Sequence, residues 1–122
     1  MCKVVVMTVD NRKIRVADIK QKYMNNIIDA AKKCDLIDKV ILFGSSIENR
    51  CTEKSDIDIA VFGNQIRSKA LSSKKYERFA RQLFAYNDFE QDYDILYFKS
   101  GTPIKSMIMD DIQKGEVLYE RA

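Results

Sequence analysis

Histidine is absent from this sequence of 122 residues. Its absence removes the Ser-His-Asp and Cys-His catalytic systems and every zinc site that contains histidine. Chemistry in this chain must therefore come from carboxylates, hydroxyls, lysine or a metal ion held by oxygen atoms. Oxygen ligands of this kind suit magnesium or manganese.

Cysteine is scarce, and the cysteines are far apart. Cys2, Cys34 and Cys51 are odd in number and form no CxxC pair, which argues against a disulfide framework or a thiolate metal site. We expect reduced thiols and a cytoplasmic protein. No segment approaches the roughly 20 apolar residues of a membrane span, and the N-terminal segment lacks the apolar core and cleavage site of a secretory signal.

A concentrated charge of one sign is also missing. The 21 basic and 18 acidic residues give a formal net charge of +3 and are scattered in both signs, whereas a dedicated nucleic-acid binder concentrates positive charge. Nucleic-acid binding is therefore unsupported. Because 46% of the residues are apolar and 32% are charged, and the length suits one core, we expect a single domain spanning residues 1–122.

Hydrophobic periodicity predicts alternating strands and helices. Residues 3–9 predict a strand, and the following Asp10-Asn11 turn with residues 13–16 indicates a hairpin or an edge strand. The other expected elements are a helix from Ala17 or Asp18 to Cys34, strands over Lys39–Phe43, Ser55–Phe62 and Asp92–Phe98, a helix over Ile66–Tyr86 broken near Ser72-Ser73, a helix from Pro103 to Gly115, and a short C-terminal tail. This order predicts an α/β (α+β) domain with helices flanking a small mixed sheet.

Two aspartates, separated by a single residue, lie on a strand that is otherwise apolar. Residues two apart on a strand share a face and stand roughly 6–7 Å apart along the chain, so Asp56 and Asp58 point the same way. Ile57 and Ile59 alternate with them and are expected in the opposite layer. Such a pair is often only the solvated face of an edge strand. However, two like charges on one face cost stability unless a cation offsets them, and two metal ions about 3.5–4 Å apart fit between carboxylates.

Gly44 and Ser45 follow the preceding buried strand. A glycine there lets backbone N–H groups approach an anion, and Ser45 adds a hydroxyl donor for a phosphate oxygen. Alone, this pair is a generic turn. A glycine-serine turn followed by a strand that carries two aspartates is a far more specific pattern. A third carboxylate is expected on a neighbouring strand. Asp92 and Asp94 are both candidates, and we favour Asp94 because it lies deeper in its strand.

These motifs resemble a known family. Gly44-Ser45, then residues 55–61 (SDIDIAV), then residues 93–96 (YDIL), resemble the GS…SDxDxxV…hDhh pattern of nucleotidyltransferases with the DNA polymerase beta fold. The resemblance is in particular to the minimal, single-domain type of bacteria and archaea, which includes antitoxin-like members. The resemblance extends from about Val40 to Tyr119, because the GEVLYERA ending is also typical of that group.

The resemblance implies transfer of a nucleoside monophosphate, with AMP expected, from an NTP to a hydroxyl acceptor. Asp56, Asp58 and Asp94 would be the catalytic residues and the ligands of two Mg²⁺ or Mn²⁺ ions. The implied phosphate-binding residues are Gly44, Ser45 and Ser55. Small family members are often encoded with a helical HEPN-type partner in toxin-antitoxin pairs, so such a partner is also implied, while a homo-oligomer stays open.

One position departs from the family pattern. Minimal members usually read GSxARG after the strand, and Glu48 stands here at the position of the arginine. We expect Glu48 to weaken NTP binding, and Arg50 is the candidate substitute for the missing cation. Two functions therefore fit the sequence: an active, metal-dependent nucleotidyltransferase, and a catalytically weak or inactive module of the same fold that acts by binding another protein.

Overall fold

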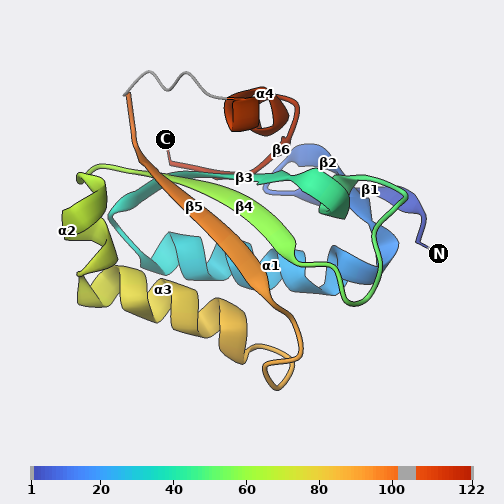
Figure 1. Ribbon diagram of the computed structural model, residues 1–122, viewed down its shortest axis with the longest axis horizontal. Coiled ribbons are helices and arrows are strands. Elements are labelled where there is room, and N and C mark those ends of the chain that lie inside the picture. The colour runs from blue at the N-terminus through green and yellow to red at the C-terminus, as the bar shows by residue number, and fades with distance from the viewer. Residues whose placement is uncertain (1, 102–106, 122) are drawn as a thin grey trace.

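The computed structural model describes residues 2–101 and 107–121 (Figure 1). The strands are β1 (Val4–Val9), β2 (Arg12–Ala17), β3 (Ile37–Phe43), β4 (Ile57–Gly63), β5 (Tyr93–Lys99) and β6 (Glu116–Glu120). The α-helices are α1 (Gln21–Lys33), α2 (Arg67–Leu71), α3 (Lys74–Ala85) and α4 (Met107–Gln113). Two 3₁₀ turns complete the order, η1 (Asp18–Lys20) before α1 and η2 (Gly44–Ile47) after β3.

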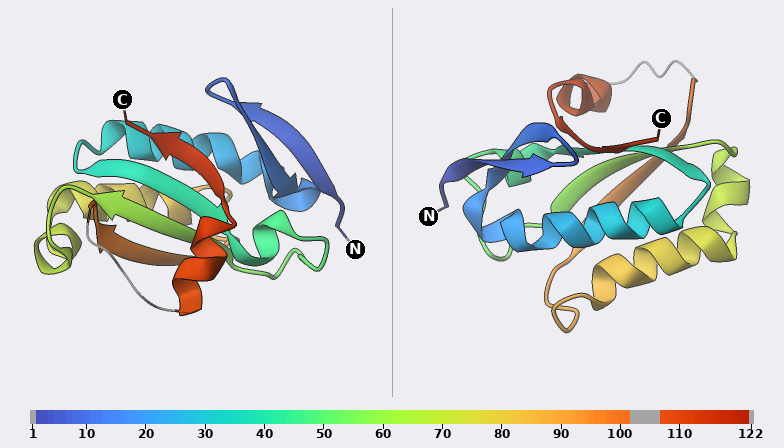
Figure 2. Two further views of the ribbon diagram at one scale, coloured as in Figure 1. Left: turned by 90° about the horizontal axis from the view of Figure 1, so that it is seen from above. Right: turned by 180° about the vertical axis from the view of Figure 1, so that it is seen from behind.

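A four-stranded mixed sheet forms the centre of the molecule. Its strand order is β5-β4-β3-β6, with β4 and β5 parallel and the other two pairs antiparallel. Seen from above in Figure 2, the hairpin of β1 and β2 lies to one side of this sheet, near β6. The expected fold class, helices flanking a small mixed sheet, is confirmed.

Helices cover the two faces of the sheet unequally. Figure 1 shows α1 and α3 together on one face and the short α4 on the other. Ile57 and Ile59 of β4 point into the larger core on the α1 side, whereas Ala60 belongs to a smaller cluster with Ile112 of α4. The alternation along β4 therefore assigns its even-numbered residues to the α4 face.

The interruption of the second long helical segment is also confirmed. The helix α2 ends at Leu71, and α3 begins after Ser73, whose hydroxyl accepts a hydrogen bond from the Tyr76 N–H at 3.1 Å. A serine that caps a helix in this way stabilises its first turn. The helix expected from Pro103 is seen only as α4, because residues 102–106, with Ile104, lie outside the described residues. None of the described helices is long and apolar enough to span a bilayer.

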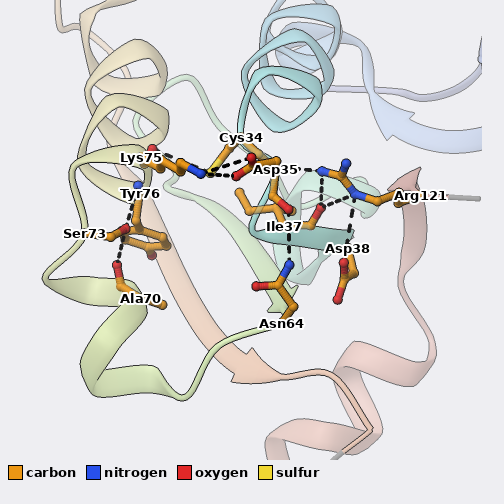
Figure 3. A network of polar contacts seen from close by, with 10 residues as sticks. All are labelled: Cys34, Asp35, Ile37, Asp38, Asn64, Ala70, Ser73, Lys75, Tyr76 and Arg121. Carbon is orange, nitrogen blue, oxygen red and sulfur yellow. Dashed lines mark hydrogen bonds and ion pairs between the residues drawn. The ribbon is translucent and has the colours of Figure 1, made fainter.

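The C-terminal segment corrects the sequence interpretation. We expected a tail after Gly115, but Glu116–Glu120 forms β6 and pairs with β3. Arg121 continues this attachment, because its guanidinium donates to the carbonyls of Cys34 at 3.0 Å and Ile37 at 2.9 Å (Figure 3). The sequence interpretation missed the strand because five residues carry little periodicity, and the free edge of β3 is a long-range feature.

We expect Arg121→Ala to lower the free energy of unfolding by about 1–3 kcal/mol, because three hydrogen bonds to backbone carbonyls are lost together. Lys39→Ala is the matched control. It removes an exposed ion pair to Glu120 at 3.6 Å, which is worth about 0–1 kcal/mol. Urea unfolding of both variants checks the prediction, and equal effects would show that Arg121 does not anchor β6.

Candidate active site

The turn that follows β3 brings backbone and carboxylate into contact. Gly44 has φ +73°, a conformation that costs glycine little and other residues more. Phe43, just before it, pairs in register with Asp58 of β4. The space where a Cβ of Gly44 would stand is already occupied by the Asp58 carboxylate oxygen Oδ2. The strand register therefore places the Asp58 carboxylate in close contact with Gly44, the first residue of η2.

The short turn η2 follows β3 directly, at the Gly44-Ser45 pair where the sequence indicates a turn. Ser45 is half-buried and Ser46 is fully buried. Among the described residues, the Ser46 hydroxyl has no hydrogen-bond partner. The half-buried Gly44 thus lies beside Asp58 at the end of a strand, and Ser45 follows it in the turn. Such a place is where an anion can reach backbone N–H groups.

Asp58 and Asp94 are neighbours across the parallel pair of strands. They are register partners in the ladder between β4 and β5, and adjacent strands lie about 4.8 Å apart. Their side chains share the α4 face of the sheet, because the intervening residues Ile57 and Ile59 point to the opposite core. Asp94 and Asp92, the other candidate, are both exposed, but Asp92 precedes β5 and has no place in the ladder with β4.

Asp56 and Ser55 lie in the loop just before β4. Asp56 is exposed. The Ser55 hydroxyl is used within the loop, where its Oγ accepts a hydrogen bond from the Thr52 N–H at 3.0 Å and lies 3.1 Å from the Thr52 hydroxyl. The structure therefore groups Gly44, Asp58 and Asp94 closely and places Asp56 at their border, while Ser55 shapes the loop.

The negative charges of Asp94 and Asp56 act on the half-buried carboxyl group of Asp58. Burial, followed by the negative charges of Asp94 and Asp56, raises the pKa of Asp58 to about 6. Within the part of the chain that the structure describes, no three Asp, Glu or Cys side chains converge tightly enough to form a metal cage. The donor set nevertheless fits a hard cation, since a positive charge relieves the repulsion between neighbouring carboxylates.

The position that departs from the family pattern carries an ion pair. Arg50 donates to both carboxylate oxygens of Glu48, at 2.7 and 3.3 Å. This pairing lowers the pKa of Glu48 and raises that of Arg50. The positive charge of Arg50 also acts on Asp58 and on Asp111 of α4. Arg50 therefore interacts electrostatically with Asp58, while its guanidinium group is paired with Glu48.

Comparison with known families decides the identity of the fold. A family model described as polymerase beta, nucleotidyltransferase, matches residues 25–122. This chain belongs to that family. The matched span includes Gly44, the three aspartates and β6, so the resemblance seen in the sequence is confirmed for this polymerase beta nucleotidyltransferase. A search of curated proteins finds no match. The hairpin of β1 and β2 and the turn η1 precede the matched span.

Sequence analysis missed two buried polar residues of this nucleotidyltransferase, Lys20 and Gln91, which are 1% and 3% exposed. The helical periodicity of the sequence could have indicated that Lys20 is buried. Lys20 falls four residues before Met24 and seven before Ile27, on the apolar stripe that continues into α1. A lysine on such a stripe needs buried acceptors, and these come from loops far along the chain.

We expect Glu48→Gln to lower the KM for an NTP by about three- to tenfold, which corresponds to about 1 kcal/mol of recovered binding. The amide no longer neutralises Arg50, so the guanidinium becomes available to a phosphate oxygen. The matched control is Glu77→Gln, which breaks the exposed pair with Arg81 on α3. An unchanged KM in Glu48→Gln would show that the ion pair does not restrain nucleotide binding.

Proposed function

We propose that this protein transfers a nucleoside monophosphate, with AMP as the first candidate, from an NTP to a hydroxyl acceptor with the aid of Mg²⁺ or Mn²⁺. The observation that carries the proposal is the register pairing of Asp58 with Asp94, on one face of the sheet and against the backbone of Gly44. Membership of the nucleotidyltransferase family supports the reaction class. The repulsion that raises the pKa of Asp58 supports a cation as ligand.

Each residue has a role in this proposal. Asp56 and Asp58 would hold the divalent ions, and Asp94 would ligate one of them and accept the proton of the acceptor hydroxyl. The backbone of Gly44 and the hydroxyl of Ser45 would bind the β- and γ-phosphates. The bound ions would supply charge stabilisation for the attacking and leaving oxygens. The acceptor oxygen forms a bond to the α-phosphorus, the bond to the bridging oxygen breaks, and pyrophosphate leaves.

Incubation with radiolabelled NTPs, magnesium and candidate hydroxyl acceptors tests the proposal. We expect wild-type protein to transfer label, and the double variant Asp56→Ala with Asp58→Ala to transfer none. Asp92→Ala is the control, since its exposed side chain makes no hydrogen bond among the described residues. Label transfer that survives in the double variant would refute the proposed site.

A second candidate function rests on the ion pair of Glu48 and Arg50. If that pair keeps the only nearby guanidinium of the described site residues away from the triphosphate, the fold would act as a non-catalytic module that binds a protein. Calorimetry with MgATP discriminates the two. Absence of heat at millimolar nucleotide favours the module, and binding that Asp58→Asn abolishes rules it out.

The resemblance also implies where the acceptor hydroxyl would reside. We propose a helical HEPN-type protein as the partner, carrying a hydroxyl side chain as acceptor. Mass spectrometry of such a partner after incubation with the enzyme and MgATP checks this, and a mass gain of one AMP is expected. A partner that binds but gains no mass supports the module instead.

A further inference from the structure

Lys20 is a buried lysine with three neutral acceptors. It ends the turn η1 and is 1% exposed. Its Nζ donates to the carbonyl of Glu53 at 3.1 Å, to the carbonyl of Ser55 at 2.7 Å, and to the Gln91 amide oxygen at 2.6 Å. All three donors of the ammonium are therefore used, and two of the acceptors lie in the loop that leads to Asp56.

Gln91 completes the link to the neighbouring strand. It is 3% exposed, and its amide nitrogen donates to the carbonyl of Ser55 at 3.0 Å and to that of Asp92 at 2.7 Å. The Ser55 carbonyl thus accepts from both Lys20 and Gln91. One buried cation and one buried amide therefore connect the residues just before β4 with those just before β5.

This linkage stands at the first rung of the ladder that aligns the carboxylates. The Asp92 carbonyl also accepts from the Ile57 N–H at 3.0 Å, and Ile57 pairs with Tyr93. The next rung pairs Asp58 with Asp94. The same contacts hold the Ser55–Asp56 peptide, so a shift of the loop would move Asp56 and the Asp58–Asp94 pair together.

Packing alone does not account for a lysine at this place. Burying an ammonium costs free energy, and apolar residues of similar volume are often equally stable or more stable in such positions. Burial lowers the pKa of Lys20, while the charges of Cys51, Asp56 and Glu53 oppose this effect. The charge of Asp56 thus acts on the Lys20 ammonium group, and the three hydrogen bonds of this group have a defined direction.

We propose that Lys20 and Gln91 are positioning residues that hold Asp56, Asp58 and Asp94 in the arrangement that binds a divalent cation. This inference rests on the proposed function and extends it to residues that touch neither nucleotide nor metal. Lys20 precedes the span that the family model matches. Removal of residues that orient metal ligands without binding the metal typically weakens metal affinity by about 10–100-fold.

The test is a titration with Mn²⁺ alone, followed by the electron paramagnetic resonance signal of the free ion. The variants are Lys20→Met, Gln91→Met and the double variant. Lys20, Gln91 and Lys22 all line one polar cleft of about 290 Å³. The control is Lys22→Met, because it removes a positive charge from this cleft, and the Lys22 side chain donates to no backbone carbonyl of the described residues. Circular dichroism establishes that each variant is folded, and Gln91→Met decides the outcome if Lys20→Met does not fold.

We expect each single variant to weaken Mn²⁺ binding at least tenfold, the double variant to be no more than about twofold weaker than the weaker single, and Lys22→Met to bind like wild type. Folded variants with lower melting temperatures but unchanged Mn²⁺ affinity would overturn the positioning role and leave the proposed function intact. Wild-type protein that binds no Mn²⁺, or binds it as well as Asp58→Asn does, would overturn the proposed function and this inference with it.

Discussion

Asp58→Asn is expected to abolish nucleotidyl transfer and to make the fold more stable at pH 8. The loss of transfer should be on the order of a thousandfold or more, because a charge that binds the reacting groups is removed from the site. The gain in stability follows from the pKa of Asp58, which rises from 3.8 to about 6. We expect about 1–2 kcal/mol, less than the full ~3 kcal/mol, because the side chain is only half-buried and solvent screens the repulsion.

The gain should depend on pH in one direction. Folded protein binds the Asp58 proton more tightly than unfolded protein does, so this group stabilises the fold below about pH 4, and that contribution disappears as the pH rises through about 6. Urea unfolding should therefore separate Asp58→Asn from wild type above pH 7 and not at pH 4. Asp92→Asn is the matched control. A less stable Asp58→Asn at pH 8, or one that still transfers, would contradict the interpretation of this residue.

Gly44→Ala is expected to destabilise the protein by about 2–5 kcal/mol and to reduce transfer strongly. Two effects add: a residue with a Cβ is strained at φ +73°, by about 1–2 kcal/mol, and the new methyl group would overlap the Asp58 carboxylate, a form of overpacking that costs about 1–3 kcal/mol. Because Asp58 must move away, the carboxylate arrangement is lost as well.

Gly101→Ala separates the two effects. Gly101 has φ +78°, but no heavy atom of residues 2–101 and 107–121 lies within 4 Å of the position of its Cβ, so we expect only the backbone strain to apply. Thermal or urea unfolding of both variants checks the difference. If Gly44→Ala costs no more than Gly101→Ala, the close approach of Asp58 to the backbone is not important for stability.

The sequence was informative where the signals are local. A glycine after a buried strand, two aspartates two positions apart and a third strand with Asp94 all act through short-range rules of turns and strand alternation. These rules correctly predicted the turn η2 and the assignment of Asp58 to the face opposite Ile57 and Ile59. They also predicted the break between α2 and α3, because serines favour caps.

The rest depends on contacts between distant parts of the chain. The strand β6 forms because it pairs with the edge of β3 and because the Arg121 guanidinium donates hydrogen bonds to the carbonyls of Cys34 and Ile37. Likewise, the acceptors of Lys20 come from the loop before β4 and from Gln91. A single sequence does not specify which distant carbonyl accepts a hydrogen bond from a given donor. Such partners follow only from the tertiary structure.

A crystal structure with Mn²⁺ and α,β-methylene-ATP, recorded at a wavelength that reveals manganese, tests the central claim most directly. We predict anomalous peaks between Asp56, Asp58 and Asp94, with the triphosphate against the backbone of Gly44 and the hydroxyl of Ser45. Nucleotide bound elsewhere, or bound here with no manganese touching Asp58 and Asp94, would contradict the account.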